Sequence, residues 1–146
     1  MARREVSAEI DIDAPAERVW EVLTDFARYP EWNPFLPSVA GELTSGASFI
    51  VRIAPPRGRA MTFRPTLLEV EKNRELSWLG RLLLPGLFDG EHHFVIEPQG
   101  ERSVRFVQRE VFTGLLVPLF GSAIGKALNG FEAMNRALKE RVEKLS

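Results

Sequence analysis

The sequence predicts an α+β domain in which seven antiparallel strands and a long C-terminal helix share one core. Three observations lead to this fold class. Residues 5–12 alternate between apolar and polar side chains, as a half-buried strand does. Residues 39–113 continue as strand-like segments separated by Gly, Pro and Asn turns. After Gly114 the apolar residues recur at helical spacing, which indicates a helix long enough to cross the sheet.

The first strand leads into a short amphipathic helix. Asp13 lies within capping reach of the helix, and Pro15 opens it, where the fixed proline φ and the missing N–H do no harm. Charged residues fill one face of this helix, and apolar residues recur at helical spacing on the other. The apolar face comprises Ala16, Val19, Trp20, Leu23 and Ala27. Three prolines within residues 29–38 then leave room for at most one more helical turn.

Six further strands follow the proline-rich bend. Connections as short as those between them join antiparallel neighbours, because parallel strands need crossovers of about a dozen residues. We therefore expect one continuous antiparallel sheet. The six strands are expected at residues 39–43, 47–54, 60–71, 75–83, 87–97 and 103–113.

The C-terminal helix is expected over residues 116–145, about 45 Å at 1.5 Å per residue. We expect Phe131, Met134 and Leu138 to face the sheet. Gly121 and Gly125 lie one turn apart and either bring the helix close to the sheet or leave room for a ligand. The apolar stripe comprises Ile124, Leu128, Phe131, Leu138, Val142 and Leu145, with Met134 in its gap, and the solvent face includes Arg136, Lys139 and Glu140.

Composition narrows the function classes. The 146 residues fit one domain, residues 1–146, without repeat or linker. A net charge of -1 gives no electrostatic case for nucleic acid. Residues 114–125 form the longest weakly polar stretch, too short to span a bilayer, and the N-terminus lacks the apolar region of a signal peptide. We therefore expect a cytoplasmic protein, as a monomer or weak homodimer.

Cysteine and histidine counts limit the chemistry further. The absence of cysteine excludes thiolate catalysis, cysteinyl zinc sites and disulfides. With only two histidines, adjacent in sequence, a tetrahedral zinc set is not expected, and no phosphate-binding loop or nucleotide motif occurs. We expect neither a metal nor a cofactor.

Several segments resemble one protein superfamily in order and spacing. Residues 14–26 (APAERVWEVLTDF) and 29–34 (YPEWNP) are similar to the opening signature of the SRPBCC, or START/Bet v 1-like, superfamily, and especially of its polyketide cyclase/dehydrase-like branch. Residues 76–78, 90–94 and 109–115 also resemble that branch. The resemblance implies a helix-grip fold, in which a curved antiparallel sheet grips the long helix around an apolar cavity for a hydrophobic small molecule. Members include cyclases and lipid carriers, so the fold does not fix the function.

The last two strands place three polar side chains on an apolar wall. Alternation puts His92, Gln108 and Glu110 on the same face as Phe94, Ile96, Val104, Phe106 and Phe112. A loop centred on Gly100 pairs Ile96 with Val104 and His92 with Gln108, which makes His92 and Glu110 diagonal neighbours. His93 is expected to point outward into solvent.

Two interpretations of this wall stay open. His92 and Glu110 form a proton-transfer or ligand-orienting pair, or they belong to a structural network in which Glu110 bonds a backbone group or an Arg. If the protein is an enzyme, these two residues are its catalytic acid and base. The ligand-binding set expected for the cavity comprises Trp32, Phe35, Trp78, His92, Phe94, Phe106, Gln108, Glu110, Phe112, Phe131 and Met134. Trp32 is equally well interpreted as a plug that closes the core.

Three functions are weighed on these grounds. The first is binding, transport or sequestration of a lipid, isoprenoid or polyketide in the cavity. The second is a cofactor-independent cyclase or dehydratase that uses His92 and Glu110. The third is transient membrane contact through the apolar residues 82–84, 87–88 and 115–120, which as strand and helix ends could instead pack on one another.

Overall fold

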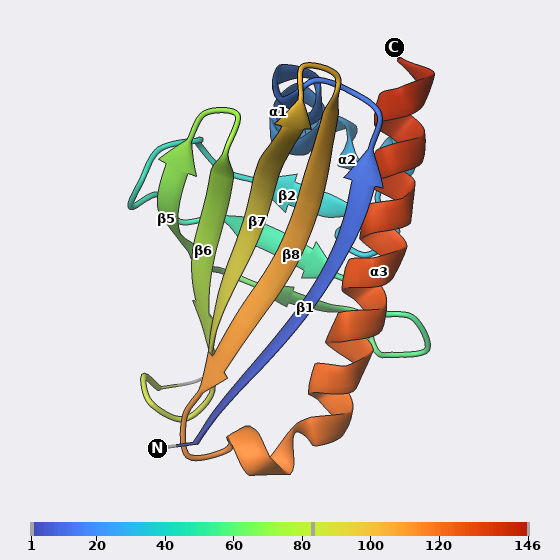
Figure 1. The fold of residues 1–146 in the computed structure, drawn as a ribbon. Helices are drawn as coiled ribbons and strands as arrows, with labels where there is room; N and C mark the ends of the chain where they lie inside the picture. The colour runs from blue at the N-terminus through green and yellow to red at the C-terminus, as the bar shows by residue number, and fades with distance from the viewer. Residues whose placement is uncertain (1, 83, 146) are drawn as a thin grey trace.

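A computed structural model describes residues 2–82 and 84–145 of the chain. Within them, a five-stranded antiparallel sheet has the order β1-β8-β7-β6-β5, and a three-stranded sheet has the order β2-β3-β4 (Figure 1). Buried side chains from both sheets and from the helices form one core. In chain order the elements are β1 (Arg3–Ile12), α1 (Ala16–Thr24), the 3-10 turn η1 (Phe26–Arg28), α2 (Tyr29–Trp32), β2 (Ser38–Ala40), β3 (Ile50–Ile53), β4 (Met61–Phe63), β5 (Thr66–Glu71), β6 (Glu75–Arg81), β7 (Asp89–Gly100), β8 (Ser103–Thr113), the 3-10 turn η2 (Val117–Leu119) and α3 (Gly121–Lys144).

The short helices close one end of the sheet. The apolar face of α1 is buried at Val19, Trp20 and Leu23, as its spacing predicts. The proline-rich bend adds η1 and α2 rather than a single turn. Tyr29 is fully enclosed, and its hydroxyl donates a hydrogen bond to the carbonyl of Leu23, which joins α2 to the end of α1.

The described residues form eight strands in two sheets, whereas seven strands in one sheet were expected. The expected strand 60–71 is divided at Arg64 and Pro65 into β4 and β5. Pro65 has no N–H to donate to a sheet ladder, so regular pairing stops there. The register nevertheless continues across the break, because the bridge between Ser48 and Thr66 lies in line with the Val51–Phe63 pair. The strands before and after Pro65 therefore keep the antiparallel order of a meander, although they belong to two sheets.

In the β7–β8 hairpin the side chains lie on the predicted faces, but the residues pair in a different register from the predicted one. Ile96 pairs with Phe106, and His92 pairs with Glu110, two residues away from the expected partners. The cause is an irregularity between Pro98 and Gly100, which shifts the turn toward residues 101–102. A shift of two residues keeps every side chain on its face, so His92 and Glu110 become direct neighbours instead of diagonal ones.

The helix α3 begins at Gly121, five residues later than expected, because Pro118 holds the preceding segment in the turn η2. Figure 1 shows α3 running from the end of the sheet near the N-terminus to the end near α1. Phe131, Met134 and Leu138 are fully buried as predicted, whereas Leu145 is 54% exposed. No helix in the described ranges is long and apolar enough to cross a membrane.

Close approach to α3 occurs at Gly130 rather than at Gly121 or Gly125. A Cβ on Gly130 would lie 2.2 Å from the ring of Phe35, whereas one on Gly125 would meet nothing within 4 Å. The segment after α2 therefore packs its phenylalanine directly on the helix backbone. Phe35 also makes an edge-to-face contact with Phe131, with ring centroids 5.7 Å apart.

Candidate functional site

Three polar side chains lie on the inner face of β7 and β8, between the sheet and α3. His92 is 4% exposed and Gln108 is fully buried. The side chain of Glu110 is 16% exposed, so Glu110 is the member of this polar cluster that meets solvent most. All three share the face of Phe94 and Phe106, as alternation along the strands predicts.

A chain of hydrogen bonds connects this polar cluster to α3. Gln108 Nε2 donates to Asn135 Oδ1 over 2.8 Å and to the Phe131 carbonyl over 3.3 Å. A carbonyl only accepts, so this end of the Gln108 amide is the NH₂ group, and Oε1 is the acceptor that faces His92. His92 Nε2 therefore donates to Gln108 Oε1 over 3.0 Å.

The other ring nitrogen of His92 faces Glu110. Because Nε2 of His92 carries a hydrogen, Nδ1 faces Glu110 Oε1 at 3.4 Å either as a second N–H or as a bare lone pair. Histidine and glutamate are residue types that serve as general acids and bases, and here they lie within reach of each other.

Gly90 makes room for the Glu110 carboxylate. A Cβ at Gly90 would lie 2.3 Å from Glu110 Oε2, so any other residue there would displace the end of the Glu110 side chain. Gly90 lies beside Phe112 in the β7–β8 ladder, two pairs from His92 and Glu110 and therefore on the same face. A glycine at this position therefore lets the carboxylate lie flat against the inner face of β7.

Aromatic rings surround His92. Its ring stacks on Phe94 at a centroid distance of 4.2 Å and lies 4.7 Å from Phe131 and 5.8 Å from Trp78. The expected ligand-binding residues other than Trp32 thus meet in one layer between the sheet and α3. The layer also holds Phe35, Phe106, Phe112 and Met134, all 6% exposed or less.

The side chains of this layer fill it. Phe94, Phe106, Phe131 and Met134 are at most 1% exposed, so almost none of their surface borders open space. The expected cavity of about 300 to 1,000 Å³ is therefore not open here. A ligand in this layer would have to move side chains, and Glu110 marks the point where the layer already meets solvent.

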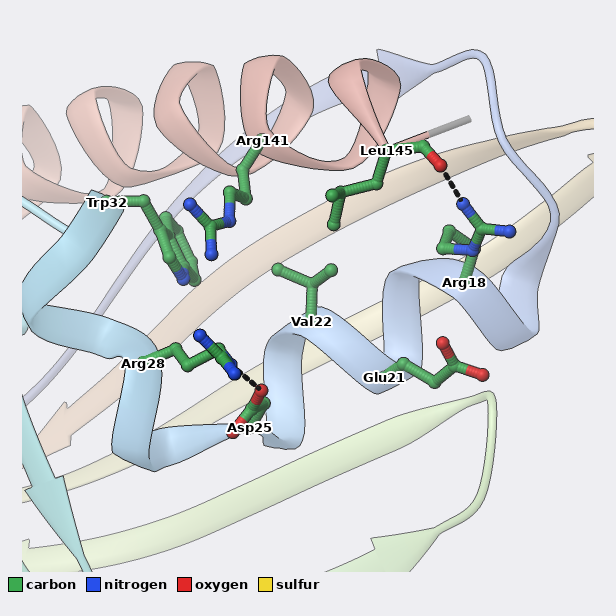
Figure 2. A pocket seen from close by; sticks show the side chains of 8 residues that line it. All are labelled: Arg18, Glu21, Val22, Asp25, Arg28, Trp32, Arg141 and Leu145. Carbon is green, nitrogen blue, oxygen red and sulfur yellow. Dashed lines mark hydrogen bonds and ion pairs between the residues drawn. The ribbon is translucent and has the colours of Figure 1, made fainter.

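The open grooves lie elsewhere. One, of about 270 Å³, lies between α1 and the C-terminal end of α3, and Figure 2 shows Trp32 there with Arg28 and Arg141. Trp32 therefore does not join the layer around His92. Each arginine already has a partner, since Arg28 contacts Asp25 at 3.3 Å and Arg141 contacts Glu31 at 2.7 Å. A second groove of about 240 Å³ lies between β1 and α3, and Asn135 reaches its wall.

His93 lies on the opposite face of β7, as expected, but its side chain is only 13% exposed. Glu75 approaches its Nδ1 at 2.7 Å and Glu91 its Nε2 at 3.4 Å. The two carboxylates cover the ring, which explains why it is not open to solvent. Among the described residues no three His, Asp or Glu side chains are arranged to hold a metal ion.

Sequence reasoning missed Asn135 and Gly90. Asn135 is 2% exposed, and its Nδ2 has no hydrogen-bond partner within the part of the chain that the structure describes. A polar residue four positions after Phe131, next to the buried Met134, is the signal that could have identified it, because that part of the helix faces the core. Gly90 carries no signal in a single sequence, since its role depends on the pairing of β7 with β8.

Comparison with known proteins supports a single fold family. A family model described as polyketide cyclase / dehydrase and lipid transport matches residues 3–143. The Zhui aromatase/cyclase from Streptomyces sp. R1128 superposes with a TM-score of 0.79 at 16% identity, over 98% of this chain and 95% of that one. A START superfamily protein from Mycobacterium smegmatis gives 0.72 at 23% identity, over 97% and 99% of the two chains.

A plant enzyme shares the fold as well. Norcoclaurine synthase from Thalictrum flavum, in complex with dopamine and hydroxybenzaldehyde, superposes with a TM-score of 0.74 at 14% identity, over 99% of this chain and 89% of that one. At these identities the superpositions establish the fold alone. No curated protein sequence matches the chain.

Proposed function

Because the chain belongs to the polyketide cyclase/dehydrase and lipid transport family, we propose that it binds a hydrophobic small molecule between the sheet and α3. The observation that carries the proposal is the polar cluster of His92, Gln108 and Glu110 inside an aromatic layer. Burying polar groups costs free energy even when they are paired, and a role in orienting a ligand would account for three of them in this apolar layer.

The chemistry of the layer points to the class of ligand. Phenylalanine and tryptophan rings offer flat apolar contacts, which suit a planar or polyunsaturated molecule such as a polyketide, an isoprenoid or a lipid chain. Glu110 accepts hydrogen bonds when ionised, and Asn135 Nδ2 is an unpaired donor at the other end of the polar chain. A ligand with one or two oxygen functions on an apolar skeleton matches both.

An enzymatic role is the second candidate, and the approach of His92 Nδ1 to Glu110 Oε1 at 3.4 Å is the observation that favours it. In a cyclase or dehydratase of the polyketide type, a base removes a proton next to a carbonyl and an acid protonates the departing oxygen. One side chain of the pair would serve as the base and the other as the acid. A cytoplasmic location and a monomeric or weakly dimeric state stay predictions beside both candidates.

The test begins with the purified protein. Native mass spectrometry of protein isolated from cells is expected to show a retained small molecule, and binding of the fluorescent probe 1-anilinonaphthalene-8-sulfonate is expected to be competed by it. His92→Phe and Glu110→Gln remove the polar groups with little change in volume, and we expect each to weaken probe binding.

The chain supplies matched controls, because the outer face of β7 carries the same residue types. His93→Phe and Glu91→Gln make identical chemical changes there and should leave binding unchanged. Loss of turnover of a polyketide substrate with unchanged probe binding would favour the enzyme. Equal binding by all four variants and the parent, with no loss of turnover in the His92 and Glu110 variants, would refute the proposed site.

A further inference from the structure

Two segments at one end of the molecule have no polar side chain. Residues 84–88 (LPGLF) join β6 to β7, and residues 114–120 (GLLVPLF) join β8 to α3. Figure 1 shows both connections at the end of the sheet where the N-terminus lies, opposite α1 and the C-terminus. We call these twelve residues the apolar tip.

The two segments of the apolar tip are joined to each other by backbone hydrogen bonds. Leu115 N donates to the Gly86 carbonyl over 3.1 Å, and Leu116 N donates to the Leu87 carbonyl over 2.9 Å. Gly114 has a φ of +134°, and a Cβ on it would lie 2.3 Å from the Leu87 carbonyl oxygen, so only glycine allows this approach.

The outer side of the tip presents leucine to solvent. Leu84 is 65% exposed, Leu115 69% and Leu119 76%, the three highest values among the large apolar side chains of the described residues. The inner side is anchored instead, because Phe88 packs on Phe112 and Phe120 with ring centroids 5.4 and 4.7 Å apart. Protruding leucines on a fixed aromatic base are unfavourable in water and suited to insertion into an apolar medium.

Arginines surround the base of the tip. Arg3 and Arg4 pair with Thr113 and Phe112, directly before Gly114, and Arg81 ends β6 just before the tip begins. Arg4 is exposed and has no ion-pair partner among the described residues. The carboxylates nearby are Glu5, which contacts Arg3 at 4.0 Å and Arg109 at 3.6 Å, and Asp89, which contacts Arg81 at 3.8 Å. Glu91 lies level with Glu5 in the ladder but contacts His93, and Arg3, Arg4 and Arg81 are the arginines next to the tip.

We propose that the apolar tip docks the protein on an anionic lipid surface, with Leu84, Leu115 and Leu119 inserted among the acyl chains and Arg3, Arg4 and Arg81 at the headgroups. Apolar side chains flanked by cationic ones are the combination that such interfaces select. A second copy of the chain fits less well, because a tip-to-tip contact would bring the two sets of arginines together. The docking is independent of whether a ligand binds around His92, and its test uses no ligand.

The experiment is cosedimentation with vesicles of phosphatidylcholine containing 30% phosphatidylglycerol, as a function of lipid concentration. We expect the parent protein to bind these vesicles and to bind pure phosphatidylcholine at least about tenfold more weakly, because each arginine near an anionic surface contributes about fivefold. The variant Leu115→Glu/Leu119→Glu should bind about 100-fold more weakly, about tenfold for each leucine withdrawn from lipid.

The control variant must add the same two negative charges at exposed apolar residues outside the tip. Ile50→Glu/Met61→Glu makes the same change at two apolar side chains on β3 and β4, each 49% exposed and outside the tip. It should keep most of the binding. A second variant, Arg3→Gln/Arg4→Gln, should lose affinity for anionic vesicles and keep its weak affinity for neutral ones.

Three results would overturn the proposal. The parent protein could fail to sediment with anionic vesicles, or the leucine variant could bind as well as its control. Sedimentation velocity could also show that the parent is a dimer that the leucine variant dissociates, without vesicle binding by either, in which case the tip is a protein interface. Thermal unfolding of each variant shows that it is folded, since all four substituted apolar side chains are exposed.

Discussion

Gly130 and Gly125 lie in the same helix, and the structure predicts opposite effects when each is replaced by alanine. Alanine in a helix interior is favoured over glycine by about 0.5 to 1 kcal/mol, because glycine loses more backbone entropy on folding. At Gly125 a Cβ meets nothing within 4 Å, so we expect Gly125→Ala to stabilise the protein by that amount.

At Gly130 the same gain is opposed by overpacking. The new Cβ would lie 2.2 Å from one carbon of the Phe35 ring and 2.3 Å from another. Phe35 is 3% exposed and is held against Phe131, so it has little room to move away. Inserting a methyl group into a packed core costs about 1 to 3 kcal/mol. We therefore expect Gly130→Ala to be destabilising or at best neutral, with the two variants differing by about 1 to 3 kcal/mol.

Urea unfolding at 25 °C measures the difference, provided that the slope m is the same in both variants. Thermal unfolding should separate their Tm values by roughly 2 to 12 °C for a domain of this size. The variant Gly130→Ala/Phe35→Leu should lose less stability than the sum of its single changes, since the smaller side chain relieves the clash. Equal stabilisation by Gly125→Ala and Gly130→Ala would refute the packing of Phe35 on α3.

Three further predictions concern charge and ionisation. Phe131→Glu should unfold the domain, because it places an unpaired carboxylate at a fully buried position; a variant that kept the parent's Tm would show that the assigned helix face is wrong. Burial raises the pKa of Tyr29 well above its ordinary value, and Tyr29 is the only tyrosine, so absorbance at 295 nm should show no tyrosinate in the folded protein at pH 11. The stability that the protonated Tyr29 hydroxyl contributes is present below the unfolded pKa of about 10 and is lost at higher pH. Hydrogen bonds from the Asp13 backbone N–H and from Lys139 lower the pKa of Glu143 below its ordinary value of 4.5. The stability that the Glu143 carboxylate contributes is therefore present above pH 4.5 and is lost as the pH falls through the lowered pKa. Glu143→Gln should unfold at a lower urea concentration than the parent at pH 7, and the difference between the two should disappear in acid.

The alternation of apolar and polar residues predicts which face of a sheet a side chain occupies, but it does not predict which residues of neighbouring strands pair. It put His92, Gln108 and Glu110 on the buried side of the sheet, because a one-residue slip would have exposed every apolar residue of the hairpin. A two-residue slip leaves the faces unchanged, so the pattern contains no information against it. The irregularity at Pro98 and Gly100 decides the register, and it makes His92 and Glu110 direct partners.

Other features depend on three-dimensional contacts that no local pattern encodes. The expected strand 60–71 has suitable residues throughout, but Pro65 ends the ladder because it cannot donate a hydrogen bond. Asn135 acquires its role only because Gln108 reaches across from β8. The volume between sheet and helix is likewise set by packing, which explains why the apolar residues were predicted correctly and the open cavity was not.

The pairing of β1 with β8 also has a consequence for how the chain is made. The two strands join residues about 100 positions apart, Arg3 with Thr113 and Ile12 with Val104. At synthesis rates of about 5 to 20 residues per second, β1 leaves the ribosome roughly 5 to 20 seconds before its partner exists. During that interval it is an unpaired strand exposed to other nascent chains. Its outward side carries Arg3, Glu5, Glu9 and Asp11, and such charges discourage pairing with a foreign edge until β8 arrives.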